Sequence, residues 1–187
     1  MKIAFIGTHG TGKTSLCLET AAWFNRNSKH IDIVKEIATD SPALSINDAT
    51  TIGSQLYILH TQIARELLAA ERFHHVVADR SILDNYAYLK RKFGPHPIEG
   101  YLFSEWISTY DFQFLVPIHY SLIGTNIRPE DELFQRDIDG LVLKLLEEHD
   151  VSHHKLTIPD PSEGGKSFIE QVKETIRKSS SEEFPLD

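Results

Sequence analysis

The feature that most constrains the fold of this chain is a glycine-rich loop close to its N-terminus, GTHGTGKT at residues 7–14. It has the pattern G-x-x-x-x-G-K-[ST], in which glycines let backbone N–H groups turn toward phosphate oxygens. Residues 2–6 before it are apolar enough for a buried strand, and Cys17, Ala21 and Phe24 after it recur at helical spacing. Strand, loop and helix N-terminus together predict a site for the phosphates of a nucleoside triphosphate.

The loop supplies most of the predicted cofactor-binding residues. We expect ATP to bind through Gly7, His9, Gly10, Thr11, Gly12, Lys13, Thr14 and Ser15. Lys13 is predicted to reach the β- and γ-phosphates and to act in catalysis, and the Thr14 hydroxyl is predicted to bind Mg²⁺.

Beyond the loop, predicted strands alternate with predicted helices. The strands are expected at residues 2–6, 30–34, 74–79, 112–123 and 155–158, and Pro117 is expected to end regular pairing in the fourth. The helices are expected at residues 13–25, 48–72, 81–92, 97–110, 131–149 and 167–178, with Asn47 or Asp48 capping the second and residues 38–47 as a loop. This alternation predicts one α/β domain over residues 1–178, a parallel sheet with helices on both faces, and a polar tail at 179–187.

Composition limits the classes of protein and partner. The net charge of −8 argues against a broad nucleic-acid-binding surface. Cys17 is the only cysteine, so no intramolecular disulfide can form, and we expect it to be a small core residue. No apolar run reaches the length of a membrane span, and the first predicted strand leaves no room for a signal peptide, so we expect a cytoplasmic protein.

Charged residues follow two of the predicted strands. Asp79 ends the third strand, where a carboxylate can bind Mg²⁺ together with Thr14, and Arg80 follows it. An arginine at that position suits a phosphoryl transferase that holds anionic groups. Glu36 follows the second strand and is predicted to orient the acceptor or take its proton. Asp79, Arg80 and Glu36 are therefore candidate catalytic residues, and Glu36 and Arg80 are also expected to bind the substrate.

Two further groups of polar residues complete the candidate site. Arg128 and Arg136 lie about two helical turns apart in a polar segment, predicted to be a lid over residues 124–137 that closes over the transferring phosphate. Gln62, Arg65 and Glu66 on the long second helix are expected to contact the acceptor. The adjacent histidines 74 and 75 are poorly arranged to bind one metal ion, because neighbouring strand residues point to opposite faces.

With these motifs the chain resembles the compact phosphate-loop kinases of nucleosides and nucleoside monophosphates. It is most similar to the ATPase/kinase family typified by the ribosylnicotinamide kinase domain, and it has likeness to thymidylate and deoxynucleoside kinases. The matching stretches are residues 3–14, 34–36, 62–66, 79–81 with Asp84 and Tyr86, and 127–132 with Arg136 and Asp139. The resemblance implies a five-stranded sheet in the order 2-3-1-4-5 and an adenine edge near residues 159–163. It also implies that Glu36, Asp79-Arg80-Ser81 and Asp84 lie at the acceptor site.

The sequence therefore predicts an ATP- and Mg²⁺-dependent kinase of a nucleoside, a nucleoside monophosphate or a close analogue. Two alternatives remain open. One is a kinase of a polynucleotide 5′-hydroxyl or of a modified base in DNA, with the cluster Lys90-Arg91-Lys92 binding phosphates. The other is a nucleotide-binding ATPase that acts as a switch or regulator. A homodimer is possible through the apolar stretch at residues 102–107.

Overall fold

Five parallel strands form the centre of the molecule, in the order β2-β3-β1-β4-β5. The computed structural model describes residues 1–40, 49–119, 132–160, 162 and 164–180. The strands are β1 Lys2–Ile6, β2 Ile31–Val34, β3 His75–Asp79, β4 Phe112–Leu115 and β5 His154–Lys155. The helices are α1 Lys13–Arg26, α2 Ile37–Asp40, α3 Ile52–Arg72, α4 Ile82–Phe93, α5 Pro97–Ile107, α6 Glu132–Glu148 and α7 Phe168–Ser179. The predicted fold class and strand order are confirmed.

The central strand β1 is buried on both faces, as its uninterrupted apolar sequence requires. Ile3 and Phe5 pack into the apolar core on one face, and Ala4 and Ile6 pack into the core on the other. β1 pairs with β3 from Lys2 opposite Val76 to Phe5 opposite Asp79. This register places the ends of β1 and β3 side by side, and the phosphate loop begins where β1 ends.

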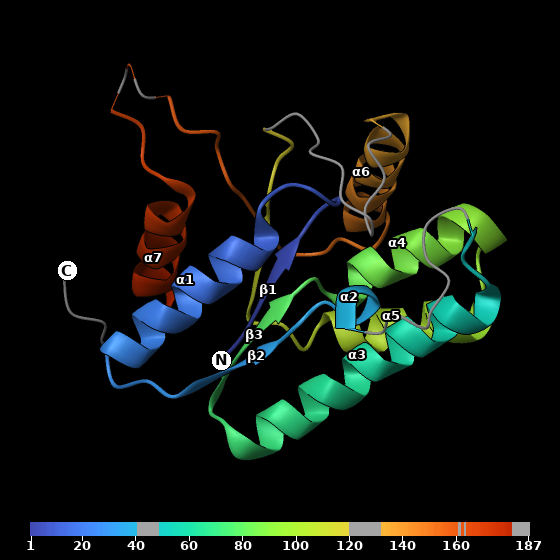
Figure 1. The fold of residues 1–187 in the computed structure, drawn as a ribbon, viewed down its shortest axis with the longest axis horizontal. Helices are drawn as coiled ribbons and strands as arrows, with labels where there is room; N and C mark the ends of the chain where they lie inside the picture. The colour runs from blue at the N-terminus through green and yellow to red at the C-terminus, as the bar shows by residue number, and fades with distance from the viewer. Residues whose placement is uncertain (41–48, 120–131, 161, 163, 181–187) are drawn as a thin grey trace.

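Two layers of helices cover the sheet (Figure 1). Helices α1 and α7 pack against one face, and helices α3, α4, α5 and α6 build the core on the other face. Because parallel strands all point the same way, their carboxyl ends form a single edge of the sheet, where open α/β folds bind ligands. The loop at residues 7–14, Glu36 and Arg80 all lie along that edge.

Several predicted boundaries differ from those in the structure. The second predicted helix is α3, which begins at Ile52 because the hydroxyl of Thr51 accepts the Ser54 N–H at 3.1 Å. The predicted caps Asn47 and Asp48 lie outside the described residues. β4 ends at Leu115, two residues before Pro117, where regular pairing was expected to stop, and residues 120–123 of the predicted strand lie outside the described residues. A short helix, α2, begins where a loop was expected. The tail at 181–187 and residues 161 and 163 of the predicted adenine edge lie outside the described residues.

Two residues of the apolar stretch at 102–107, Phe103 and Ile107, pack inside the chain's own core, so these side chains are not available for the dimer seam that was considered possible. Phe103 is fully buried and stacks on Tyr86 with ring centroids 5.1 Å apart, and Ile107 belongs to the same core. Within the described part of the chain, no helix has both the length and the apolar character needed to cross a bilayer.

Candidate active site

Two contacts of Gly7, with the backbone at Val116 and with the Asp84 side chain, hold the phosphate loop in place. Its φ of 128° suits glycine, and a Cβ there would lie 2.9 Å from the carbonyl oxygen of Val116. The Gly7 N–H donates to Asp84 Oδ1 at 2.7 Å, so the first turn of α4 anchors the start of the loop. Gly10 and Gly12 also have positive φ, and α1 begins directly after Gly12. The loop backbone thus has the conformation that the motif predicts.

Lys13 is a buried cation at the N-terminus of α1. Its ammonium donates to the carbonyl oxygen of Thr8 and to Thr11 Oγ1, the latter at 3.2 Å. Burial, together with the charge of Arg80, lowers the pKa of Lys13 to about 8. A buried ammonium at a helix N-terminus is electrostatically unfavourable without an anion, so the loop is arranged to receive negative charge.

Thr14 and Asp79 meet at the carboxyl edge of the sheet, as predicted. The Thr14 hydroxyl donates to Asp79 Oδ2 at 2.6 Å. A hydroxyl and a carboxylate beside a phosphate site are the hard oxygen donors that Mg²⁺ takes from protein, with water and phosphate completing its shell. These two side chains fit a magnesium ion. Elsewhere in the described residues, no group of three or more His, Cys, Asp or Glu side chains could hold a metal ion.

Glu36 and Arg80 form a buried ion pair next to the loop. Arg80 Nε lies 2.7 Å from Glu36 Oε1, and both side chains are about one-tenth exposed, at 7% and 11%. Burial disfavours the guanidinium charge, but Glu36 and the nearby Tyr88 and Asp84 outweigh it and raise the pKa of Arg80. Arg80 Nη1 is buried and has no hydrogen-bond partner among the described residues.

The backbone of Arg80 has a φ of 93°, a conformation that side-chain-bearing residues rarely adopt. Such strain costs on the order of 1–3 kcal/mol and persists only where the surroundings impose it, most often at functional sites. Here it accompanies a hydrogen bond from the Arg80 N–H to the carbonyl oxygen of Phe5 at 3.2 Å. The turn after β3 is therefore fixed with the Arg80 side chain beside the phosphate loop.

One cavity joins these groups. It has a volume of about 130 Å³ and is lined by residues 9–15 of the loop together with Glu36, Asp79 and Arg80. The structure thus brings the predicted cofactor residues, the predicted metal residues and the predicted acceptor carboxylate to one place.

Tyr88 is a residue of this region that the sequence reading missed. Its hydroxyl lies 3.2 Å from His9 Nδ1, and its ring lies under the Arg80 guanidinium at 5.1 Å. His9 also packs against Phe134 of α6 at 5.6 Å, and Gln135 Nε2 donates to the His9 carbonyl oxygen at 2.8 Å. The only sequence signal was the position of Tyr88 four residues after Asp84, which puts the two on the same face of α4.

Three of the predicted substrate residues are placed in other roles or elsewhere. Asp84 is fully buried and accepts the N–H groups of Gly7 and Ser81, the latter at 2.8 Å, so it supports the loop and caps α4. Glu66 is 1% exposed and its carboxylate is bonded by Lys2, Gln62, Trp106 and Tyr110. Arg65 lies with residues of β2 in a separate hollow. We assign Asp84 and Glu66 structural roles, because their oxygens already bind groups of the protein.

One side-chain atom of Gln62, its Oε1, can accept a hydrogen bond from the phosphoryl acceptor. Its amide nitrogen donates to Glu66 Oε1 at 2.6 Å and to the Arg80 carbonyl oxygen at 3.2 Å. Its Oε1 is buried and has no hydrogen-bond partner within the described part of the chain. Through its amide nitrogen, Gln62 is thus bonded directly to the turn at Arg80, the residue with the positive φ.

The predicted lid is only partly described. Arg128 lies outside the described residues. Arg136 is at the start of α6 with its side chain 74% exposed, 3.9 Å from Glu132. The basic cluster at residues 90–92 is largely neutralised, since Lys90 pairs with Glu148 at 2.9 Å and Arg91 pairs with Asp137 at 3.2 Å.

Comparison with known proteins places this geometry in context. Residues 2–163 match the model of a family described as AAA domain. No curated protein sequence is similar enough to count as a match. The structure is similar to that of deoxyadenosine kinase from M. mycoides with the products dCMP and dCDP, with a TM-score of 0.65 and 16% identity over 95% of this chain and 100% of that one.

Two other solved structures have the same fold. Thymidylate kinase from Ehrlichia chaffeensis gives a TM-score of 0.64 at 16% identity, over 95% of this chain and 97% of that one. The NadR protein in complex with NR gives 0.73 at 14% identity, over all of this chain and 51% of that one. At such identities the likeness concerns the fold.

Proposed function

Since this chain belongs to the AAA domain family and shares its fold with nucleoside and nucleotide kinases, we propose that it is an ATP-dependent kinase of a small acceptor. The acceptor is a nucleoside, a nucleoside monophosphate or a close analogue. The observation that carries this proposal is the single cavity that joins the phosphate loop, Asp79 and the Glu36–Arg80 pair.

In the proposed reaction the loop and Lys13 bind the triphosphate. The loop N–H groups and the Lys13 ammonium face the β- and γ-phosphates, and the buried charge of Lys13 is neutralised by them. Thr14 and Asp79 would hold Mg²⁺, which supplies charge neutralisation on the phosphates. The low exposure of Lys13 strengthens these contacts, because water screens them little.

The Glu36–Arg80 pair holds the acceptor. Arg80 has a buried Nη1 still able to donate to an acceptor oxygen, and Glu36 fixes the guanidinium. For a hydroxyl acceptor, its oxygen bonds to the γ-phosphorus while the bond from that phosphorus to the β,γ-bridging oxygen breaks. ADP leaves, and the hydroxyl proton passes to the Glu36 carboxylate. Arg128 and Arg136 of the proposed lid would stabilise the transferring phosphoryl group.

The first experiment measures ADP formation from ATP and Mg²⁺ with a panel of nucleosides, nucleoside monophosphates and a DNA oligonucleotide. We expect one small acceptor to stimulate turnover and to appear as its phosphorylated product. Stimulation by DNA alone would support a polynucleotide kinase. Turnover that ignores every acceptor would support an ATPase switch and contradict the roles given to Glu36 and Arg80.

The variant Lys13→Ala tests the loop. We expect a folded protein whose phosphotransfer falls about 100-fold or more, because one charged donor to the transferring phosphoryl group is lost. Lys144→Ala, which changes an exposed lysine of α6, is the matched control and should keep wild-type activity. Full activity in Lys13→Ala would overturn the assignment of this loop as the catalytic nucleotide site.

A further inference from the structure

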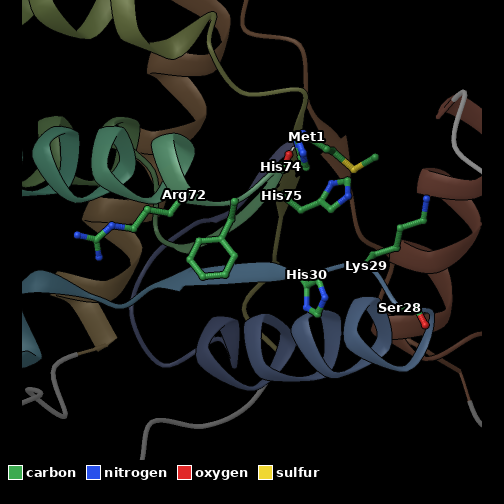
Figure 2. Close-up of a pocket in the computed structure, with 8 residues that line it drawn as sticks. Met1, Ser28, Lys29, His30, Arg72, His74 and His75 are labelled. Carbon is green, nitrogen blue, oxygen red and sulfur yellow. Dashed lines mark hydrogen bonds between the residues drawn. The ribbon is translucent and has the colours of Figure 1, made fainter.

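A second, larger hollow lies at the opposite end of the sheet, where β2 and β3 begin. It has a volume of about 750 Å³ and opens between the end of α1, the end of α3 and the first residues of these strands. Figure 2 shows the side chains that line it. This volume falls within the range of ligand pockets for small molecules.

The lining of this hollow is basic and aromatic. It includes Lys29 and Arg72, the three histidines His30, His74 and His75, and the ring of Phe73. In the view of Figure 2, the Lys29 and Arg72 side chains extend at opposite ends of the hollow, with the His30 and His75 imidazoles between them. The described residues that line it include no carboxylate, although the chain as a whole carries a net charge of −8. Two carboxylates lie just beyond this lining: Asp111 Oδ2 is 3.9 Å from the Met1 nitrogen, and Asp32 lines a neighbouring hollow together with Arg72.

The helix dipole accounts for the position of only one of these basic side chains. Arg72 lies in the last turn of α3, where a cation is favoured by the helix dipole. The histidines are not helical, because His30 precedes β2, His74 precedes β3 and His75 is the first residue of β3. His75 is held in place by packing edge-on against Phe24 at 5.2 Å, whereas His30 and His74 are exposed.

We propose that this hollow is a binding site for an oligophosphate anion, carried either by a nucleotide or by inorganic polyphosphate. Ammonium, guanidinium and imidazole N–H groups are the side-chain donors that phosphate oxygens accept. The flat faces of Phe73 and the imidazoles suit a nucleobase in addition. The site is distinct from the phosphate loop, because β1 separates Met1 from Gly7 by five residues, or roughly 16 Å. The inference stands independently of the proposed kinase activity.

The test uses the full chain with Lys13→Ala, so that binding at the phosphate loop is suppressed. Calorimetric titrations with sodium tripolyphosphate and with ADP measure binding in this background. They are repeated after adding Lys29→Ala and Arg72→Ala, and after adding the control pair Lys144→Ala and Lys178→Ala, two exposed lysines elsewhere. Imidazole NMR signals, assigned with His30→Gln and His74→Gln, report the location. Circular dichroism checks that each variant is folded.

We expect one equivalent of tripolyphosphate to bind and to shift the His30 and His74 signals. Removing Lys29 and Arg72 should weaken binding by at least about tenfold, because two charge-assisted contacts are lost, while the control pair should change it less than about twofold. Tighter binding of ADP than of tripolyphosphate would identify a nucleotide as the source of the phosphates, and the reverse would identify polyphosphate. An equal loss in both pairs, or unshifted imidazole signals, would overturn the proposal.

Discussion

At the scale of single residues, four side chains connect the phosphate loop with the proposed acceptor pair. Glu36 pairs with Arg80, Arg80 lies over the Tyr88 ring, and the Tyr88 hydroxyl bonds to His9 in the loop. Burial raises the pKa of Tyr88, so its hydroxyl remains protonated and able to donate at neutral pH. Tyr88 thus supports Arg80 with its ring and His9 with its hydroxyl.

Two substitutions separate these roles of Tyr88. Tyr88→Phe keeps the ring but loses the contact with His9, so we expect the KM for ATP to rise about fivefold, the equivalent of one net hydrogen bond. Tyr88→Leu also removes the ring under Arg80 and should raise the KM for the acceptor as well. Steady-state kinetics on both substrates measure this split. Tyr57→Phe, an exposed tyrosine of α3, is the control, and an unchanged acceptor KM in Tyr88→Leu would contradict the role of the ring.

At the scale of elements, Glu66 joins α3 to β1, α5 and the segment after it. Its carboxylate lies 2.5 Å from Lys2 Nζ and accepts hydrogen bonds from Trp106 Nε1 and the Tyr110 hydroxyl, each at 2.8 Å. Lys2 also lies over the Trp106 and Tyr110 rings, at 4.3 and 4.2 Å. Burial lowers the pKa of Lys2, and the charge of Glu66 opposes that shift. The pair holds three elements together inside the apolar layer.

Removing one charge of this pair should destabilise the whole domain. We expect Glu66→Gln to lower the free energy of unfolding by about 3 kcal/mol, because the largely buried Lys2 ammonium loses its carboxylate partner and keeps only the Thr109 hydroxyl and the aromatic rings. The double variant Lys2→Met with Glu66→Gln should recover part of that loss. Urea unfolding measures both, with Glu71→Gln on the exposed side of α3 as control. A wild-type midpoint for Glu66→Gln, together with a raised acceptor KM, would instead favour a substrate contact.

The elements also show which parts of the site the sequence could predict. The phosphate loop and its flanking elements depend on local pattern, and the meeting of Thr14 with Asp79 follows from the shared edge of parallel strands. The protein partners of Glu66 could not be foreseen, because a polar residue on a helix has the same sequence signal whether it faces a ligand or a lysine of the protein. The contact of Tyr88 with His9 joins residues 79 positions apart, so no local pattern could reveal it.

At the scale of the whole molecule, the buried ammonium of Lys13 at the carboxyl edge of the sheet sets a dependence of stability on pH. Its pKa is lowered from 10.5 to about 8 in the folded chain, chiefly by burial. Between these two values the unfolded chain holds a proton on this lysine that the folded chain has lost, so stability rises with pH there. Below pH 8 the folded chain must carry the buried charge, and the stabilisation is absent.

The variant Lys13→Met should remove this dependence. We expect the stability of the wild type, relative to Lys13→Met and without nucleotide, to increase by about 3 kcal/mol between pH 7 and pH 10.5, at 1.36 kcal/mol per pKa unit. Urea unfolding at intervals across this range measures the difference, which cancels the titration of other groups. Lys144→Met, at an exposed lysine, should give a difference that hardly changes with pH. A flat difference for Lys13→Met as well would mean that the folded chain stabilises the Lys13 charge without any bound anion. Burial of the Lys13 charge would then not be a reason for the loop to bind an anion.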